Sequence, residues 1–273
     1  NMTRCLEEAD PQAFIGVPTA HFFRRLLGWG KASVTVNIST ARRTSRRSGM
    51  ISLTTLRERG RQSTRSLPEI DGADPAIIAF TSGSTGVPKG VVYSHALLHA
   101  QTKVLRECFG IEEGERELVT FPHFALFGPG LGLTLVPATM DFARPGRAIP
   151  SWIVRSLRDY EITHVFGSPA LLSRVGRYGA SRGVKLPALR RVISAGAPVP
   201  SRVVSQLSDM LEGGTFFTPY GATESLPVTC ITGSEILGET LALTEAGRGA
   251  LAQERKEWGQ FTTAVNMVLG EAT

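Results

Sequence analysis

From about Pro75 onward, short apolar segments alternate with segments of helical periodicity, and this alternation is the strongest constraint on the fold. Residues 76–80, 162–166 and 191–194 are short and rich in Val, Ile, Ala and Phe. Such runs are typical of strands that are buried on both faces of a parallel sheet. The repeated strand–loop–helix order therefore predicts an α/β fold with a mainly parallel sheet and flanking helices.

The other elements follow from the same reading. We expect Ser94 to cap a helix that buries Leu97, Val104, Leu105 and Cys108, and Ser151 to cap another that buries Ile153, Leu157 and Tyr160. Further strands are expected at 91–93, 118–121 and 215–218, and further helices at 169–175 and 200–211. Ligands of parallel α/β sheets bind at the carboxyl ends of the strands, and three distinctive loops follow predicted strands here.

The first of these loops has the composition of a phosphate-binding loop. Glycines allow close backbone approach to an anion, while hydroxyls, backbone N–H groups and one lysine supply donors and charge. A Gly/Ser-rich segment can also be a plain linker, but a strand before it and a lysine at its end favour phosphate. It is not a Walker loop, because no Ser or Thr follows the lysine to hold Mg²⁺. The proposed phosphate contacts are Thr81, Ser82, Gly83, Ser84, Thr85, Gly86 and Lys89.

Residues 78–89 resemble the AMP-binding signature of the adenylate-forming superfamily, which groups acyl-CoA synthetases, luciferases and peptide-synthetase adenylation domains. Two more segments resemble motifs of that family in the expected order. Residues 220–224, Tyr-Gly-Ala-Thr-Glu, match its YGxTE motif, and residues 194–198, Ser-Ala-Gly-Ala-Pro, resemble its adenine-side turn. The resemblance covers about 75–238 and is closest to fatty-acyl-CoA ligase-like proteins and olefin-pathway β-lactone synthetases.

The resemblance implies an ATP-dependent activation of a carboxylic acid, fatty or otherwise apolar, as an acyl-adenylate. It assigns catalytic roles to Lys89, to Thr223 at the α-phosphate, and to Glu224 as the Mg²⁺ ligand that the loop lacks. A single carboxylate completed by phosphate oxygens suits Mg²⁺. The remaining nucleotide contacts that it implies, around the adenine, are Gly196, Ala197, Pro198, Tyr220 and Gly221.

A gate to the acyl pocket is implied at His123 and Phe124, where the family has an aromatic and histidine segment. From the sequence alone, His123 is equally well read as a partly buried structural histidine. His95 and His164 are interpreted as structural. The acceptor of the acyl group is left open between CoA, a carrier protein and an internal hydroxyl that would give a β-lactone.

The sequence also departs from the family pattern. It has no counterpart of the ribose-binding aspartate or of the lysine on the C-terminal lid, and family members are about twice as long. We therefore expect an incomplete copy of the large N-terminal domain without the lid, impaired in turnover, and leave its status as an enzyme open. The expected division is a basic, weakly patterned lead-in (1–66), a partial AMP-binding core (67–240) and a divergent polar tail (241–273).

Two alternatives to an active ligase follow. The first is a non-catalytic remnant that binds a nucleotide or a partner. The second is a nucleic-acid-binding module, suggested only by eight arginines between Arg42 and Arg65 in a chain of net charge +6. That run has neither interleaved aromatics nor a nucleic-acid-binding motif, so we interpret it as solvated or disordered and expect no nucleic-acid partner. The sequence predicts no particular oligomeric state.

Cysteine spacing and apolar segments bear on the compartment. Cys5, Cys108 and Cys230 are far apart and form no CxxC pair, so we expect a reducing cytoplasm and no disulfide framework. Residues 121–140 carry no Asp, Glu, Lys or Arg, but they contain three prolines and three glycines. A strand-and-loop passage is therefore favoured over a membrane span, and no stable membrane insertion is expected.

Overall fold

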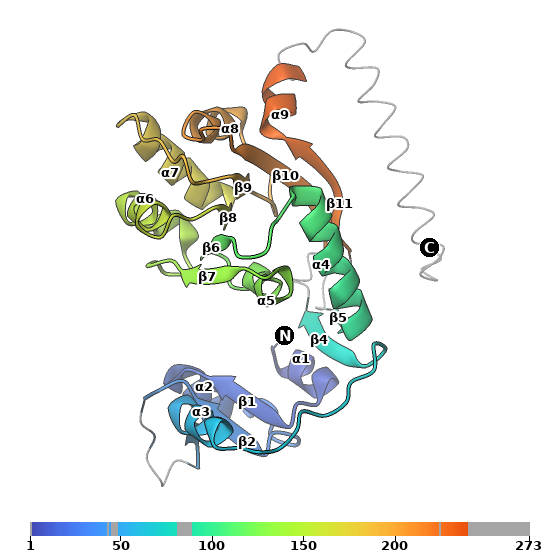
Figure 1. Cartoon of the computed structure of the whole chain (residues 1–273). Helices are drawn as coiled ribbons and strands as arrows, with labels where there is room; N and C mark the ends of the chain where they lie inside the picture. Colours follow the sequence, from blue (N-terminus) through green and yellow to red (C-terminus); the bar gives the residue numbers. More distant parts are fainter. Residues whose placement is uncertain (1, 43, 45–48, 81–88, 224, 240–273) are drawn as a thin grey trace, which may run out of the picture. The chain divides into compact units, whose positions relative to one another are not determined.

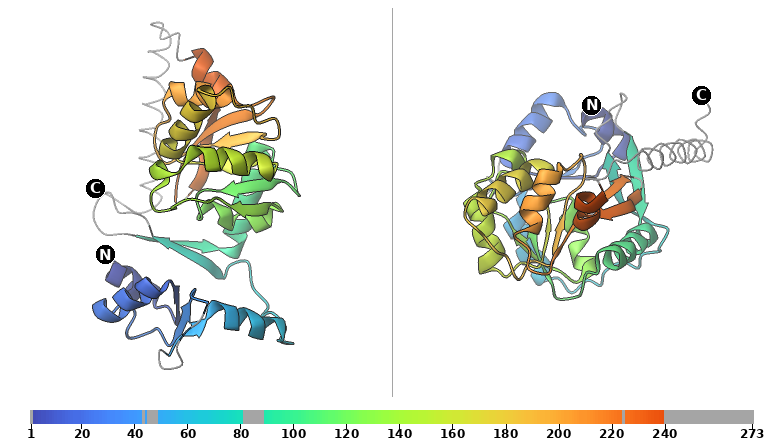
Figure 2. Two further views of the ribbon diagram at one scale, coloured as in Figure 1. Left: turned by 90° about the vertical axis from the view of Figure 1, so that its left-hand side faces the viewer. Right: turned by 90° about the horizontal axis from the view of Figure 1, so that it is seen from above.

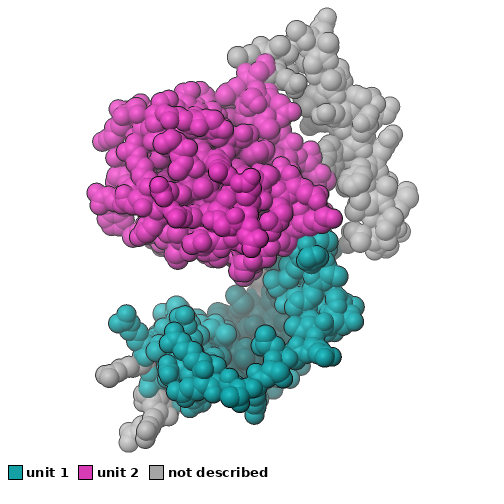
Figure 3. All heavy atoms as spheres, in the orientation of Figure 1, with its two compact units in different colours: residues 1–101 teal, residues 102–273 magenta. Residues whose placement is uncertain are grey.

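The computed structural model describes residues 2–42, 44, 49–80, 89–223 and 225–239 (Figure 1). By its internal contacts the chain divides into two compact units, residues 1–101 and 102–273 (Figure 3). The expected boundaries at residues 66 and 240 remain predictions.

Unit 1 begins with a small parallel sheet and its helices. The helices are α1 (Met2–Ala9), α2 (Pro18–Leu27) and α3 (Leu53–Arg61), and the strands are β1 (Ala13–Gly16), β2 (Val36–Ser39) and β3 (Ile51–Ser52), in the order β1-β2-β3. His21 of α2 is buried and its Nε2 lies 3.0 Å from the carbonyl oxygen of Ile38 in β2. Regular structure therefore occurs where the sequence indicated only a weak pattern.

The arginine-rich segment lies partly in this region. Arg57, Arg59 and Arg61 are exposed on α3, and Arg42 and Arg65 are exposed as well. The interpretation as a solvated stretch is confirmed at these described positions, while the disordered alternative is wrong for α3. The arginines at 43, 46 and 47 lie outside the described residues.

Unit 1 also contains the strands on either side of the glycine-rich loop. β4 (Pro75–Phe80) and β5 (Gly90–Ser94) pair antiparallel, with Phe80 opposite Gly90. Both strands were predicted, but they form a two-stranded sheet of their own instead of joining a parallel sheet. The loop is therefore the connection of a hairpin.

Unit 2 contains a six-stranded sheet in the order β11-β10-β9-β8-β6-β7. β6 (Arg116–Val119), β7 (Thr134–Pro137), β8 (His164–Phe166), β9 (Arg191–Ile193) and β10 (Thr215–Ala222) are parallel to their neighbours, and only β11 (Ser225–Thr232) is antiparallel. The predicted α/β fold with a mainly parallel sheet is confirmed.

Successive strand residues point to opposite faces of this sheet, which gives it two cores. Val165, Val192 and Phe216 pack against α6 (Pro150–Asp159), α7 (Pro169–Ala180) and α8 (Ser201–Ser208). Their neighbours Phe166 and Ile193, with Phe217, pack against the second half of α4 (His95–Phe109) and against α5 (Gly128–Leu131). Figures 1 and 2 show the sheet between these two groups of helices.

Several helix predictions need correction. Ser94 does cap α4, since its Oγ accepts from the backbone N–H of Leu97 at 3.2 Å. The buried positions of α4 are Gln101, Leu105 and Phe109, spaced four apart, so Leu97, Val104 and Cys108 are exposed instead of buried. Ile149, and not Ser151, directly precedes α6, and Tyr160 at the end of that helix is exposed. The last two corrections concern helix ends: α7 continues five residues past Val175, and α8 ends at Ser208.

The segment 121–140 is not a membrane span. It contains a 3-10 turn, η2 (Phe124–Leu126), then α5 and β7. Among the described residues, none of the helices has the length and apolarity needed to cross a bilayer. The remaining elements of unit 2 are a second 3-10 turn, η3 (Pro145–Arg147), and α9 (Gly233–Glu239).

Candidate functional site

Three loops of unit 2 follow strands of the parallel sheet at their carboxyl ends, where ligands of such sheets bind. They follow β6, β8 and β9, which are neighbours in the sheet. The backbone N–H of Gly167, after β8, donates to the carbonyl oxygen of Ile193 at 2.8 Å, and that of Ser194, after β9, donates to Phe217 of β10 at 3.0 Å. These two bonds join the ends of neighbouring strands. The loops after β6 and β9 carry two of the predicted site segments, the gate residues and the turn of 194–198, to one edge.

The turn after β9 contains the predicted adenine-side residues. Gly196 has φ +86°, which an L-residue adopts only with strain, and a Cβ there would meet no atom within 4 Å. The need for glycine is therefore conformational. Gly196, Ala197 and Pro198 are all exposed, so their backbone is open to a flat ring.

Tyr220 and Gly221 lie inside β10 and not in a loop after it, which corrects the expected strand end at Thr218. The extension arises because β11, which the sequence analysis missed, pairs with β10 and places Thr229 opposite Tyr220. Tyr220 is 58% exposed. A Cβ on Gly221 would lie 2.7 Å from the carbonyl oxygen of Ser225, so glycine permits the tight return of the chain. Thr223 is half-buried, and Glu224 lies outside the described residues.

Aromatic side chains gather around the loop after β6. The rings of Phe124 and Phe166 are stacked, with centroids 4.1 Å apart and planes inclined by 9°. Phe121 lies 5.5 Å from Phe166 and 5.1 Å from the His123 ring, centroid to centroid. The Thr120 hydroxyl donates to the carbonyl oxygen of Phe166, which joins the ends of β6 and β8. The predicted gate residues His123 and Phe124 therefore belong to one aromatic group; His123 is exposed and Phe124 half-buried.

The predicted phosphate loop is in unit 1, whereas the other predicted site residues are in unit 2. Lys89 is described and exposed, directly before β5. Thr81, Ser82, Gly83, Ser84, Thr85 and Gly86 lie outside the described residues. The structure thus brings together the turn of 194–198, the β10–β11 hairpin and the aromatic group within one unit, and their role in nucleotide binding remains a prediction.

No group of three or more His, Cys, Asp or Glu side chains suited to a metal occurs in the described ranges. Mg²⁺ bound with phosphates commonly takes only one or two protein carboxylates. The prediction that Glu224 holds Mg²⁺ therefore does not require such a group, and it remains a prediction.

A charged cluster that the sequence analysis missed lies at the opposite, amino-terminal edge of the same strands. The buried Arg191 forms an ion pair with the buried Glu115 and donates to the carbonyl oxygens of Phe109 and Gly110 at the end of α4. Arg190, which is exposed, lies 2.7 Å from Glu112 and 3.1 Å from Glu115. Burial alone would raise the pKa of Glu115, but the hydrogen bond and charge of Arg191 lower it below its usual range.

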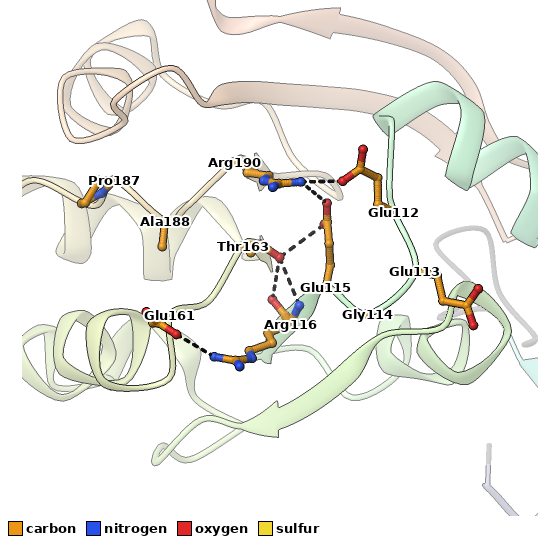
Figure 4. A pocket seen from close by; sticks show the side chains of 10 residues that line it. All are labelled: Glu112, Glu113, Gly114, Glu115, Arg116, Glu161, Thr163, Pro187, Ala188 and Arg190. Atoms are coloured by element: carbon orange, nitrogen blue, oxygen red, sulfur yellow. Dashed lines mark hydrogen bonds and ion pairs between the residues drawn. The ribbon is translucent and has the colours of Figure 1, made fainter.

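This cluster borders a polar cavity of about 510 Å³ (Figure 4). Its side chains already pair with one another, since Arg116 binds Glu161 and Thr163 reaches Glu115 at 3.3 Å. Two further buried ionisable groups, Glu117 of β6 and His164 of β8, lie in the same sheet. Burial raises the pKa of Glu117 to about 7, and burial reinforced by Arg191 lowers the pKa of His164 to about 4. The neutral, buried His164 agrees with its structural interpretation.

A model of the family described as AMP-binding enzyme matches residues 1–252. The chain belongs to the AMP-binding enzyme family. This match extends well beyond residues 75–238, on which the resemblance was based, and includes the basic lead-in and part of the tail. The sequence motifs therefore identified the family correctly but underestimated how much of the chain is related to it.

Curated relatives agree with this assignment. The chain is 45% identical over 249 residues to an olefin β-lactone synthetase from Stenotrophomonas maltophilia, covering 91% of this chain and 44% of that protein. It is 43% identical to an olefin β-lactone synthetase from Xanthomonas campestris pv. campestris, covering 91% and 43%. A long-chain-fatty-acid–CoA ligase from Thermus thermophilus is 32% identical over 155 residues, or 55% and 28%. The chain thus spans less than half the length of these relatives.

Solved structures support the fold. A fatty acyl CoA synthetase from Mycobacterium tuberculosis superposes with a TM-score of 0.66 at 20% identity, covering 86% of this chain and 44% of that one. An amide bond synthetase from Marinactinospora thermotolerans gives a TM-score of 0.66 at 23% identity, covering 88% and 45%. At these identities the likeness concerns the fold alone.

Proposed function

We propose that this chain carries the nucleotide-binding part of a reaction in which ATP activates an apolar carboxylic acid as an acyl-adenylate. The family match over residues 1–252 is the observation that carries this proposal. The placement of the 194–198 turn and the aromatic group at the carboxyl edge of one parallel sheet supports it.

The proposed chemistry needs little covalent participation by the protein, so positioning and charge would provide most of the catalysis. The substrate carboxylate attacks the α-phosphate of ATP and pyrophosphate leaves. In this proposal, residues 82–89 bind the β- and γ-phosphates, Lys89 supplies positive charge, and Thr223 contacts the α-phosphate. Mg²⁺, held by Glu224, would neutralise phosphate charge. Tyr220, whose ring is largely exposed, stacks on the adenine against the open turn at Gly196.

The aromatic group supports an apolar acid as substrate. Phe121 and Phe124 both contact Phe166 at the edge where the acyl chain of a bound substrate would lie. Aromatic side chains contribute large apolar contact areas, and rings that are partly exposed can gain burial when an apolar ligand binds.

For the acceptor of the acyl group, the names of the two relatives at 45% and 43% identity favour an internal hydroxyl. A hydroxyl on the β-carbon of the acid would attack the activated carboxyl, form a β-lactone and release AMP without CoA. Thioester formation with CoA is the second candidate, favoured by the fatty-acid–CoA ligase relative. Analysis of products from a 3-hydroxy acid, with and without CoA, distinguishes the two.

Pyrophosphate exchange tests the activation step. The chain is incubated with Mg·ATP, labelled pyrophosphate and a panel of acids of increasing apolar length, and incorporation of label into ATP is measured. We expect exchange that depends on the acid and falls in Lys89→Ala, while Lys103→Ala, an exposed lysine on α4, serves as the matched control. Binding of Mg·ATP without exchange for any acid would support a non-catalytic nucleotide-binding remnant instead.

A further inference from the structure

The helices on one side of the unit 2 sheet carry a concentration of arginines. η3, α6 and α7 follow one another in sequence, and α7 contacts both of the others (Figures 1 and 2). Between residues 144 and 180 the chain has six arginines and no lysine, but only two acidic residues, Asp159 and Glu161. Five of the six arginines are exposed and one is half-buried. We call them the arginine face: Arg144, Arg147, Arg155, Arg158, Arg174 and Arg177.

The arginine face keeps its positive charge. Arg174 donates to the carbonyl oxygen of Ala148 at 3.0 Å, and Arg158 donates to that of Lys185 at 3.2 Å. These acceptors carry no formal charge. Within the described parts of the chain, none of the six arginines forms an ion pair with a carboxylate, and Glu161 is paired with Arg116 instead. The face therefore has local charge to offer a partner.

Two apolar side chains lie among these arginines. Ile149 directly precedes α6 and is 45% exposed, and Trp152 in the first turn of the helix is 47% exposed. The backbone N–H of Trp152 donates to the carbonyl oxygen of Ile149 at 3.1 Å. Arg155 is three residues further along α6, on the same side as Trp152. Exposed tryptophan beside arginine is typical of surfaces that contact the headgroup region of a bilayer.

The apolar pair lies toward the carboxyl edge of the sheet. β7 and β8 are both parallel to β6, and α6 returns the chain from the carboxyl end of β7 to the amino end of β8. The first turn of α6 is therefore at the carboxyl edge. α7 also begins there, because its capping residue Ser168 comes two positions after Phe166 of the aromatic group. The arginine face thus has its apolar end at the edge that carries the aromatic group.

We propose that the arginine face docks on the surface of an anionic lipid bilayer, with Trp152 and Ile149 in the headgroup region. Each arginine held near such a surface strengthens binding by about fivefold. A bilayer also takes up the apolar side chains, whereas a nucleic-acid duplex offers phosphate charge but no apolar layer to Ile149. This peripheral contact requires no helix that spans the membrane.

The docking would bring an apolar substrate to the site. A bilayer holds fatty and other apolar acids, so contact through the arginine face would place the carboxyl edge of the sheet beside a store of them. This consequence rests on the proposed function. The docking itself does not, and it is measured without nucleotide or acid.

The charge is tested by co-sedimentation of the full chain with vesicles of phosphatidylcholine alone and of equal parts phosphatidylcholine and phosphatidylglycerol. We expect binding to the anionic vesicles and little to the neutral ones, and binding that weakens as added salt shortens the range of the charges. The double variant Arg155→Gln, Arg177→Gln should bind about tenfold or more weakly. The matched control is Arg57→Gln, Arg59→Gln, which removes the same charge from the exposed side of α3 and should bind like the wild type.

The apolar contact is tested in the same assay. Trp152→Ala should weaken binding to the anionic vesicles several-fold. Leu26→Ala removes an apolar side chain that is 66% exposed on α2, in unit 1, and should leave binding unchanged. All variants are compared only where circular dichroism shows the wild-type fold.

Four results would overturn the proposal. The first is equal or absent binding to both kinds of vesicle. The second is an equal loss in the α3 double variant, which would mean attraction by net charge without a defined face. The third is a loss in Leu26→Ala and none in Trp152→Ala. The fourth is tighter binding, through the same arginines and at the same salt, to a duplex oligonucleotide or to poly-glutamate. Failure to bind Mg·ATP with vesicle binding intact would count against the proposed function alone.

Discussion

Phe124 stacks on Phe166 with ring centroids 4.1 Å apart, so the turn after β6 is packed against the end of the neighbouring strand β8. Residues 42 positions apart (166 − 124) therefore build one aromatic surface at the carboxyl edge of the sheet. In the proposed function this surface borders the acyl chain.

Replacing Phe124 tests that surface. Phe124→Ala removes the stack, and because the ring is half-buried we expect a loss of about 1–3 kcal/mol in the free energy of unfolding, less than for a fully buried Phe. Urea denaturation followed by tryptophan fluorescence measures it. Leu126→Ala, at a 61% exposed position in the same turn, is the control and should change stability little. Equal losses in both variants would contradict the importance of the stack.

Arg191, the first residue of β9, and Arg190, directly before it, should differ strongly in their contribution to stability. Arg191 and Glu115 are both buried, so Arg191→Gln leaves the buried Glu115 carboxylate with only the exposed Arg190 as a charged partner, and we expect a loss at the low end of about 3–5 kcal/mol. Arg190→Gln breaks only exposed or half-exposed ion pairs and should cost less than about 1 kcal/mol. Denaturant unfolding of the two variants measures the difference, and a similar cost for both would refute the assignment.

The buried pair Glu117 and His164, which are register partners on β6 and β8, makes stability respond to pH in a specific way. The pKa of His164 is lowered to about 4, so between about pH 4 and 6.5 the unfolded state binds more protons and this group makes stability rise with pH. The pKa of Glu117 is raised to about 7, so between about pH 4.5 and 7 the folded state binds more protons and stability falls with pH.

The pH dependences that His164 and Glu117 give to the free energy of unfolding have opposite signs, so they largely cancel in the wild type. Glu117→Gln should expose the histidine slope and gain stability relative to wild type as pH rises from 4.5 to 6.5, by an amount on the order of 3 kcal/mol. His164→Gln should show the opposite trend of similar size. Both are measured as differences from the wild type across the pH range, which removes the contribution of other groups. Identical pH profiles for the three proteins would count against these pKa directions.

Gly221 provides a test of the hairpin. A Cβ there would lie 2.7 Å from a backbone oxygen of Ser225, so Gly221→Ala should displace the β10–β11 return. We expect a destabilisation of about 1–3 kcal/mol, as for other overpacked sites. Gly238→Ala in α9, where a Cβ would meet nothing within 4 Å, is the matched control and should be neutral or slightly stabilising. A neutral Gly221→Ala variant would show that the return is not tightly constrained.

Much of the fold was predictable because its signals are local. The apolar runs at β8 and β9, the Ser94 cap of α4 and the strands on either side of the phosphate loop all lie within a few residues. β11 was missed because Pro227 interrupts its apolar pattern, and a proline is normally evidence against a strand interior. As an edge strand, β11 tolerates it. The extension of β10 through Tyr220 followed from the same omission.

The site was predictable only as separate motifs. Resemblance located the glycine-rich loop and residues 220–224, but nothing local links Glu115 to Arg191 across 76 positions. Such pairs depend on the order of strands in the sheet, which places β9 beside β8 and β10 and sets the end of α4 against them. Sequence spacing alone carries no information on that order.

Isothermal titration calorimetry of the chain with Mg·ATP tests the central claim most directly, using wild type, Lys89→Ala, Glu224→Ala and the control Lys103→Ala. The account predicts binding by the wild type and the control, with affinity reduced about tenfold or more in Lys89→Ala and Glu224→Ala, as expected for loss of a charge-assisted phosphate or metal contact. A folded wild-type chain that does not bind Mg·ATP, or equal binding by all four proteins, would contradict it.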